Sequence, residues 1–404
     1  MSNNNMNKKF LLTIFSVFAL VVSAYAKRPE AKYVFFFIGD GMGASQVSVT
    51  ESYLSHLEGR LGGAQLTFTT FPYLGMCTTY SANSIITDSS ASGTAIATGT
   101  KTNNGMLGVD PQGEPLTGMA QIFKDKYNYQ VGIFSSVPLN HATPASFYGH
   151  VMSRGDYYTI TTQIPASNFD FIGGSGILQF SKEGEALDSE EFLEQNGYEV
   201  VFGQREFEQA KGNKIVMVAN PRTDHKSEVA NYAAQEDELV SLSQMMKDCL
   251  ATFDEGKPFF IMCEGGEIDW TSHANETMPT ITAILAMDEA VKVAYEFYLK
   301  HPKETLIIVT ADHQTGGVSV GSTEYGYDVN WDGVIEQWEA SEEKDKFNSV
   351  ESRNEFNRSC GIGWTTVHHN GDHVPVYAIG KGAEKFCGRM DNTEFIKKIL
   401  PCGK

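Results

Sequence analysis

The stretch YVFFFIGD, residues 33–40, is an apolar run that ends in a glycine and an acid. A run this short, apolar at consecutive positions, is typical of a strand buried on both faces of a parallel sheet. Four further runs have the same character, at residues 130–134, 259–263, 306–310 and 374–379. Stretches with helical periodicity lie between them, most clearly at 237–253 and 278–300. This alternation predicts the α/β class, with a doubly wound, mostly parallel sheet built on these five strands and helices on both faces.

Three of the predicted strands lead directly into acids, which are Asp40, Glu264 and Asp312. The carboxyl ends of parallel strands meet at one edge of a sheet, so we expect these three side chains to converge. Converging carboxylates repel each other, and divalent cations between them would remove that repulsion. Taken singly, each acid is more often an ordinary turn or cap residue.

Histidines beside the acids favour the metal site over the turn residues. Asp269 and His273 are four residues apart, as two ligands on one helical face would be. His313 follows Asp312 directly, and three more histidines stand shortly before the strand expected at 374–379. Together these groups predict a centre that holds more than one metal ion.

The first 26 residues have the pattern of a signal peptide. Lys8 and Lys9 precede an apolar run at 10–22, and residues 24–26 (AYA) supply a small-residue cleavage site. The run is short for a membrane span, and no second long apolar segment follows. We expect an exported chain, periplasmic or secreted, that begins at Lys27 and has no stable membrane anchor.

The net negative charge of the chain limits which molecules it is expected to bind. The 404 residues carry 31 basic and 50 acidic side chains, a formal charge of −19, which becomes −21 when the two lysines of residues 1–26 are removed. Such a chain repels nucleic acid and anionic lipid, so nucleic acid is not expected as a structural partner. The length allows two domains, but we expect residues 27–404 to form one.

Six cysteines are too few for a disulfide scaffold. Cys387 and Cys402 are the pair we consider, with free thiols an equally open alternative. Cys249 and Cys263 lie in or beside apolar runs and are expected to be buried thiols.

The small-residue stretch ITDSSASGT, residues 86–94, resembles the nucleophile signature of alkaline phosphatases. By itself this stretch would indicate a loop rich in serine and glycine that leads into an alanine-rich helix. The resemblance extends from Asp40 to Val374, with the motifs in the family's order. It implies that Ser89 accepts the phosphoryl group, that Ser90 is a neighbour, and that Asp88 orients a phosphate-binding arginine.

The same resemblance implies two zinc ions and a third, harder ion. One zinc would be bound by Asp269, His273 and His369, and the other by Asp40, Asp312 and His313. The third ion, normally Mg²⁺, would share Asp40 and be bound by Glu264 and Thr143. Imidazole and carboxylate suit zinc, and oxygen ligands suit magnesium. His369 is preferred because His369-Asn370-Gly371 matches the family's His-x-Gly; His368 and His373 remain alternatives in supporting roles.

Three other positions are assigned through the resemblance. Arg154 is similar to the family's arginine that binds two phosphate oxygens at once. His141 and Trp270 stand beside the substrate where many bacterial members have an aspartate and a lysine. Losing a carboxylate should weaken Mg²⁺, so the third ion is either Mg²⁺ or a third Zn²⁺.

An insertion expected at about 320–362, between His313 and His369, contains DVNWDGVIEQWE, residues 328–339. This segment fits the EF-hand calcium loop and predicts bound Ca²⁺. Its ligands would be Asp328, Asn330, Asp332, the backbone of Val334, Glu336 and Glu339. The alternative is an acidic turn that enters a helix at 336–346.

The function implied is hydrolysis of small phosphate monoesters at alkaline pH through a phosphoserine on Ser89, with release of inorganic phosphate, by a homodimer. A sulfatase would need a Cys/Ser-x-Pro-x-Arg motif, which is not found in the sequence. A phosphodiesterase usually lacks ligands for the third ion, here Glu264 and Thr143. A non-catalytic exported protein that binds phosphate or calcium is the rival from another class.

Overall fold

The computed structural model describes residues 28–220, 240–321, 326–340 and 349–401. The predicted signal peptide and Cys402 lie outside these ranges. In the described part, a ten-stranded sheet has the order β14-β2-β13-β8-β1-β7-β3-β4-β6-β5. Its strands are β1 (Tyr33–Gly39), β2 (Tyr73–Thr78), β3 (Gln130–Ser135), β4 (Phe171–Gly174), β5 (Glu199–Phe202), β6 (Ile215–Val218), β7 (Phe259–Gly265), β8 (Thr305–Ala311), β13 (Val374–Gly380) and β14 (Gly388–Asp391).

The predicted α/β class is confirmed, and all five predicted strands are present. β1 pairs in parallel with both β7 and β8. The expectation that residues 374–379 form a parallel strand is wrong, because β13 runs antiparallel to β8 and β2. The short strands β9 (Gln314–Thr315) and β12 (His369–Asn370) explain the reversal. They pair just beyond β8, so the chain is already at the carboxyl edge when it enters β13.

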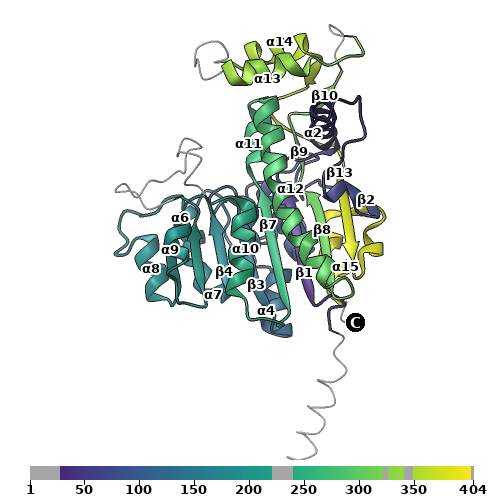
Figure 1. Cartoon of the computed structure of the whole chain (residues 1–404). Coiled ribbons are helices and arrows are strands. Elements are labelled where there is room, and N and C mark those ends of the chain that lie inside the picture. The colour runs from purple at the N-terminus through teal and green to yellow at the C-terminus, as the bar shows by residue number, and fades with distance from the viewer. Residues whose placement is uncertain (1–27, 221–239, 322–325, 341–348, 402–404) are drawn as a thin grey trace, which may run out of the picture.

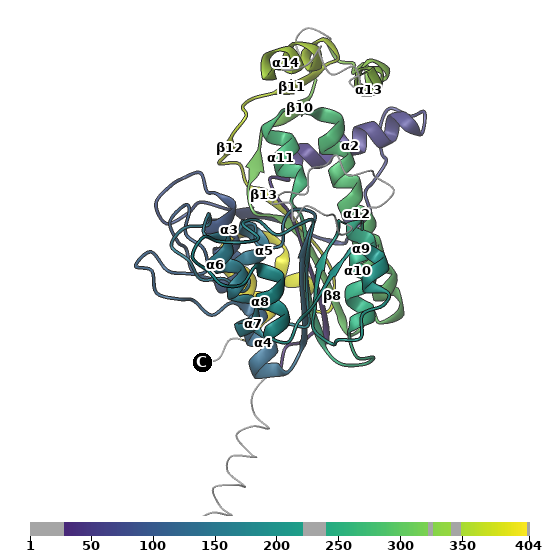
Figure 2. The same ribbon diagram turned by 90° about the vertical axis from the view of Figure 1, so that its left-hand side faces the viewer.

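Helices cover both faces of the sheet, with α3, α4 and α5 on one side and α10 and α12 on the other (Figures 1 and 2). The predicted helix at 278–300 is observed as α12, and the described part of 237–253 contains α10. The helices are α2 (Ala44–Leu57), α3 (Ser89–Thr98), α4 (Met119–Tyr127), α5 (Ala142–Ala145), α6 (Tyr157–Thr162), α7 (Ile164–Ser167), α8 (Ser189–Gln195), α9 (Gly203–Phe207), α10 (Leu242–Thr252), α11 (Glu267–His273), α12 (Thr277–Lys300), α13 (Trp331–Ala340), α14 (Val350–Ser359) and α15 (Phe395–Ile399). No described helix has the length and apolar character needed to cross a membrane.

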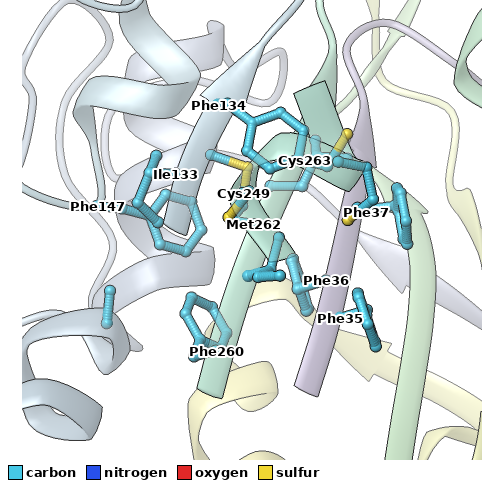
Figure 3. Close-up of a cluster of buried hydrophobic side chains, with 14 of the residues drawn as sticks. Phe35, Phe36, Phe37, Ile133, Phe134, Phe147, Cys249, Phe260, Met262 and Cys263 are labelled. Carbon is cyan, nitrogen blue, oxygen red and sulfur yellow. The ribbon is translucent and has the colours of Figure 1, made fainter. Parts of the chain in front are cut away.

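The core consists of the central strands and the helices packed on them (Figure 3). Phe35, Phe36 and Phe37 on β1 are all fully buried, as a strand covered on both faces requires. Each such side chain contributes roughly 1.5–3 kcal/mol to stability. Cys249 and Cys263 are buried free thiols, as expected. This packing fixes the ends of β1, β7 and β8, where the acids lie.

The insertion forms a separate layer above α2 and α12 (Figure 1). It consists of α13, α14 and a ribbon of β10 (Val318–Val320) and β11 (Ile362–Trp364). A small second core joins it to the main body, made of Val49, Met278, Ile281, Val318, Trp331, Val334, Cys360 and Ile362. The insertion is therefore packed against the helices rather than extended into solvent.

The conformation of residues 328–339 differs from the predicted calcium loop. Helix α13 begins at Trp331, so Asp332, Val334 and Glu336 lie in a helix and not in an open loop. The reason is local: Oδ1 of Asn330 accepts a hydrogen bond from the backbone N–H of Gly333 (3.1 Å), which caps the helix. Oδ1 of Asp332 lies 3.1 Å from Nε2 of His56. Calcium binding stays a prediction, and the first turn of α13 would have to open for it.

Candidate metal centre and nucleophile

Three strand ends bring the predicted acids together. Asp40 follows β1, and Asp312 follows β8. Glu264 is near the end of β7, where it is the register partner of Ile38 on β1. The backbone N–H of Asp40 donates to the carbonyl of Gly265 (3.2 Å), which continues the strand pairing to the site. All three carboxylates are almost completely buried. The convergence expected from the parallel sheet is therefore present.

One cluster consists of Asp40, Asp312 and His313. Nε2 of His313 lies 3.2 Å from Oδ1 of Asp40 and 3.3 Å from Oδ2 of Asp312. The ligand atoms of all three lie within 4.8 Å of one another. The same two carboxylate oxygens are buried and accept no hydrogen bond within the described chain. Buried acceptors without donors are costly, so this arrangement fits a cation.

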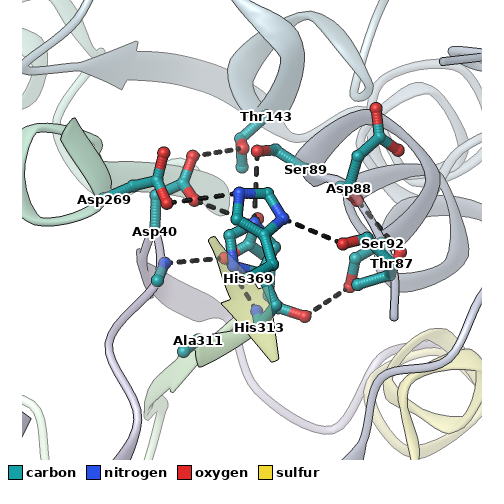
Figure 4. A network of polar contacts seen from close by, with 12 residues as sticks. Asp40, Thr87, Asp88, Ser89, Ser92, Thr143, Asp269, Ala311, His313 and His369 are labelled. Carbon is teal, nitrogen blue, oxygen red and sulfur yellow. Dashed lines mark hydrogen bonds and ion pairs between the residues drawn. The ribbon is translucent and has the colours of Figure 1, made fainter. Parts of the chain in front are cut away.

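The second cluster consists of Asp269, His273 and His369. Nε2 of His273 lies 3.4 Å from Oδ2 of Asp269, and Nε2 of His369 lies 3.4 Å from its Oδ1. The two Nε2 atoms are 3.1 Å apart. The His313 ring stacks on that of His369 with centroids 3.6 Å apart, so the two clusters adjoin (Figure 4).

Backbone carbonyls orient both imidazoles of the second cluster. Nδ1 of His273 lies 2.6 Å from the carbonyl of Val367, and Nδ1 of His369 lies 2.9 Å from that of Thr87. When Nδ1 carries the proton, Nε2 presents its lone pair to the site, as a metal ligand requires. Among the described residues, the ligand atoms of Asp269, His313 and His369 also lie within 4.8 Å of one another, whereas those of His273, His368 and His373 belong to no group this compact.

Ser89 is the first residue of α3, and its Oγ lies 3.3 Å from Nε2 of His313. Asp88 caps this helix by accepting a hydrogen bond from the N–H of Ala91 (3.0 Å). The small side chains of α3 have a packing reason, since nine of its ten residues are buried. A Cβ on Gly93 would lie 2.4 Å from Oγ of Ser146, just beyond α5. The small side chains of α3 thus allow this helix to lie close to α5.

Arg154 lies between Asp88 and His141. Its Nη1 is 3.2 Å from Oδ2 of Asp88, and its Nη2 is 3.2 Å from Nε2 of His141. Burial and then the charge of Arg154 lower the pKa of His141 to about 3, so this imidazole is neutral. Its ring packs edge-on against that of Trp270. The structure therefore joins these four predicted residues in one chain of contacts that starts at Asp88, the residue before Ser89.

The ligands predicted for a third ion lie next to Asp40. Oγ1 of Thr143 donates to Oδ2 of Asp40 (3.4 Å), and Oε1 of Glu264 is buried without a hydrogen-bond partner. Oε2 of Glu264 accepts a hydrogen bond from Ser135, a residue that the sequence analysis missed. Its position at the carboxyl end of β3 was the available signal. Thr315, which donates to Asp269, was missed as well because it forms part of the two-residue strand β9.

The electrostatics agree with several cations. Burial and then the charge of Asp269 raise the pKa of Asp312 to about 7, and burial raises that of Glu264 to about 7. Burial, followed by the charge of Asp312, raises the pKa of Asp40 as well. Burial also disfavours the charge of Asp269, but hydrogen bonds from His273 and His369 outweigh it and lower the pKa. Without metal, burial favours the protonated forms of Asp40, Asp312 and Glu264, whereas the two histidines keep Asp269 ionised. The imidazole and carboxylate groups fit zinc, and the oxygen groups of Asp40, Glu264 and Thr143 fit a harder ion.

Comparisons with known proteins agree with this chemistry. A sequence model of the family described as Alkaline phosphatase matches residues 31–402. The chain is 29% identical to alkaline phosphatase 4 of Bacillus subtilis, over 93% of this chain and 90% of that protein. It is similar to the cold-active alkaline phosphatase of a psychrophilic Shewanella species, with a TM-score of 0.78, 26% identity, and coverage of 91% and 98%. A variant of the TAB5 enzyme with one histidine replaced by glutamate, described with Mg bound in the M3 site, has a TM-score of 0.72 at 27% identity and coverage of 92% and 98%.

Proposed function

The chain belongs to the alkaline phosphatase family and is a metal-dependent hydrolase of phosphate monoesters, and we propose that Ser89 is its nucleophile. One observation carries the assignment. Oγ of Ser89 lies 3.3 Å from Nε2 of His313, at the start of a buried helix whose capping residue, Asp88, forms an ion pair with Arg154.

We propose that the two clusters hold zinc ions. Asp40, Asp312 and His313 would bind the ion nearest Ser89, and Asp269, His273 and His369 would bind the other. When bound, such ions lower the pKa of hydroxyl groups and water and neutralise the charge that develops on oxygen. The third ion would be bound by Asp40, Glu264 and Thr143.

The chain's own groups then carry out two displacements. Oγ of Ser89 loses its proton to solvent and attacks phosphorus; the bond to the leaving oxygen breaks, that oxygen takes up a proton from water, and a phosphoserine remains. Water attacks this phosphoserine from the opposite side, the bond to Oγ breaks, and inorganic phosphate leaves. The free N–H groups of the first turn of α3 favour the negative phosphoryl group in both steps.

Arg154 would bind two phosphoryl oxygens that do not react. A planar guanidinium group can donate to both at once, which holds phosphorus in line with Oγ. Since these contacts involve only the phosphoryl group, we propose that many small phosphate monoesters are substrates.

The identity of the third ion depends on His141. A neutral imidazole beside Thr143 supplies no negative charge, which weakens the binding of Mg²⁺. We therefore propose that the third site binds either Zn²⁺ or Mg²⁺. The TAB5 variants in which one histidine is replaced by an acid are described with Mg bound, which is consistent with an acid favouring that ion.

Other properties remain proposals from the sequence. We propose export to the periplasm or the medium after removal of residues 1–26, a single domain at 27–404, and a homodimer. Calcium at residues 328–339 is proposed on the EF-hand pattern, with α13 opening at its first turn. Removal of calcium alone should then lower the melting temperature before it lowers activity.

The test is a pair of serine variants. Ser89→Ala should lower the turnover of an aryl phosphate by roughly 10³-fold or more, while bound zinc stays unchanged. Ser90→Ala is the matched control, because Oγ of Ser90 donates to Oδ2 of Asp88 (2.8 Å), which is not one of the proposed metal ligands. It should keep most of the activity. Substantial turnover in Ser89→Ala would overturn the assignment.

A further inference from the structure

A buried asparagine joins the insertion to the metal centre. Asn357, on α14, is only 3% exposed. Its Nδ2 donates to the carbonyl of Asn275 (3.1 Å), and its Oδ1 accepts from Oγ1 of Thr277 (2.9 Å). Asn275 lies in the turn between α11 and α12, directly after His273, and Thr277 is the first residue of α12. The two ends of one amide thus bind both sides of the turn that follows a metal ligand.

The turn itself is held from several directions. Asn275 adopts a left-handed backbone conformation (φ 54°) and is almost completely buried. A non-glycine residue adopts this conformation at a cost and needs partners to keep it. Nε of Arg353, also on α14, donates to the carbonyl of Ala274 (2.7 Å). Two side chains of helix α14 therefore hydrogen-bond to the backbone directly after α11.

The segment that leads to His369 is joined to the same place. With its amide oriented so that both ends have partners, Asn275 donates to the carbonyls of Ser272 (3.0 Å) and Thr366 (2.9 Å). Nε1 of Trp364 donates to Oγ1 of Thr277 (3.1 Å). His273 and His369 come from segments about 100 residues apart, and this network fixes one relative to the other.

The other cluster is fixed by different parts of the fold. Asp40 and Asp312 follow strands of the central sheet, where β1 and β8 pair. The N–H of Gly41 donates to Oδ1 of Asp312 (3.2 Å), and Oγ of Ser92 donates to its carbonyl (2.7 Å). The hydrogen bonds of Asn357 go to the turn after His273 instead. A change at Asn357 should therefore affect one cluster and spare the other.

We propose that Asn357 is a positioning residue for the metal ion at Asp269, His273 and His369, acting through the turn at 274–277. This inference rests on the metal assignment in the proposed function. Groups that hydrogen-bond directly to metal-binding histidines typically contribute about 10–100-fold to metal affinity, and Asn357, which acts one residue further out, should lie at the lower end of that range. The insertion is then part of the apparatus that holds one of the two zinc ions.

The test measures zinc release from the metal-loaded enzyme with a coloured chelator. We expect Asn357→Leu to weaken the binding of one zinc ion by roughly 10-fold and to leave that of the second as in the unmodified protein. Thr277→Val removes one of the same hydrogen bonds from the other side at similar volume, and should have a smaller effect of the same kind. Excess zinc should restore activity in both variants, which it would not do for a merely misfolded protein.

Two control variants separate positioning from general destabilisation. Glu355→Ala changes an exposed residue of the same helix and should leave both zinc equivalents unchanged. Val334→Ala removes packing from the small core of the insertion, where Val334 is 2% exposed, without touching the polar network. Equal loss of zinc in Val334→Ala and Asn357→Leu, loosening of both zinc ions, or loosening of neither would overturn the proposal.

Asp269→Asn distinguishes this failure from failure of the metal assignment. If Asp269→Asn releases one zinc while Asn357→Leu releases none, only the positioning role is wrong. If Asp269→Asn also retains both ions, the assigned ligands are wrong, and the proposed function loses its metal site.

Discussion

Oδ2 of Asp88 lies 3.2 Å from Nη1 of Arg154 and also accepts hydrogen bonds from Ser90 (2.8 Å) and from the N–H of Gly105 (3.1 Å). The other oxygen of Asp88 caps α3. One carboxylate therefore fixes both the helix that begins with Ser89 and the guanidinium group beside it. We therefore propose that Asp88 orients these groups rather than removes a proton.

Asp88→Asn should weaken phosphate binding. The amide keeps an oxygen that can cap α3 but no longer forms an ion pair with Arg154, so the guanidinium group loses its fixed position. We expect the inhibition constant of inorganic phosphate and the KM to rise by about 10-fold, the equivalent of ~1.4 kcal/mol. The measurement is steady-state kinetics with phosphate as inhibitor. Asp88→Ala should in addition lose about 1 kcal/mol of stability with the cap. An unchanged inhibition constant in both variants would contradict this role.

His141→Asp should change the ion preference of the third site. A carboxylate in place of the neutral imidazole adds negative charge and a hard oxygen ligand beside Thr143, which favours Mg²⁺ over Zn²⁺. We expect activity to become dependent on added Mg²⁺, with one more magnesium and fewer zinc ions per chain by metal analysis. His141→Asn, which adds no charge, is the control. Identical metal content in the two variants would show that charge at this position does not select the ion.

Sequence periodicity predicted the central strands because β1, β7 and β8 are buried on both faces, which leaves a continuous apolar run. The convergence of the acids at the ends of these strands could be predicted from parallel pairing alone. The direction of β13 could not be predicted in this way, since an apolar run carries no sign of strand direction. The calcium loop was preferred to a turn that enters a helix at 336–346, and the observed helix begins earlier, at Trp331. Asn330 is both a calcium-loop residue and a good helix cap, and the sequence does not distinguish the two uses.

Metal removal should make stability depend on pH. Without metal, the pKa values of Asp312 and Glu264 are raised to about 7 in the folded protein, from about 4 in the unfolded chain. Between these values the folded state binds more protons than the unfolded state, so the free energy of unfolding falls as pH rises. The stabilisation is complete below about pH 4 and lost above about pH 7.

The measurement is thermal unfolding between pH 5 and 8, with and without chelator. We expect the melting temperature of the metal-free protein to fall across this range and that of the metal-loaded protein to change less. Asp312→Asn removes one of the two titrating groups and should flatten the curve of the metal-free protein. A metal-free protein that becomes more stable towards pH 8 would show that these acids are not buried together.

Gly93→Val should move Ser89, the proposed nucleophile, away from the residues of α5. A Cβ at this position would lie 2.4 Å from Oγ of Ser146, whose hydroxyl donates to the carbonyl of Thr143. The added side chain must push α3 away from α5, which costs roughly 1–3 kcal/mol and moves Ser89 relative to Thr143. Gly118→Ala is the matched control, because the new Cβ would meet its nearest neighbours at 3.6 Å, an ordinary contact. We expect kcat to fall in Gly93→Val by more than the melting temperature alone explains, and to stay unchanged in Gly118→Ala. Full activity in folded Gly93→Val would mean that the close approach of the two helices does not position the nucleophile.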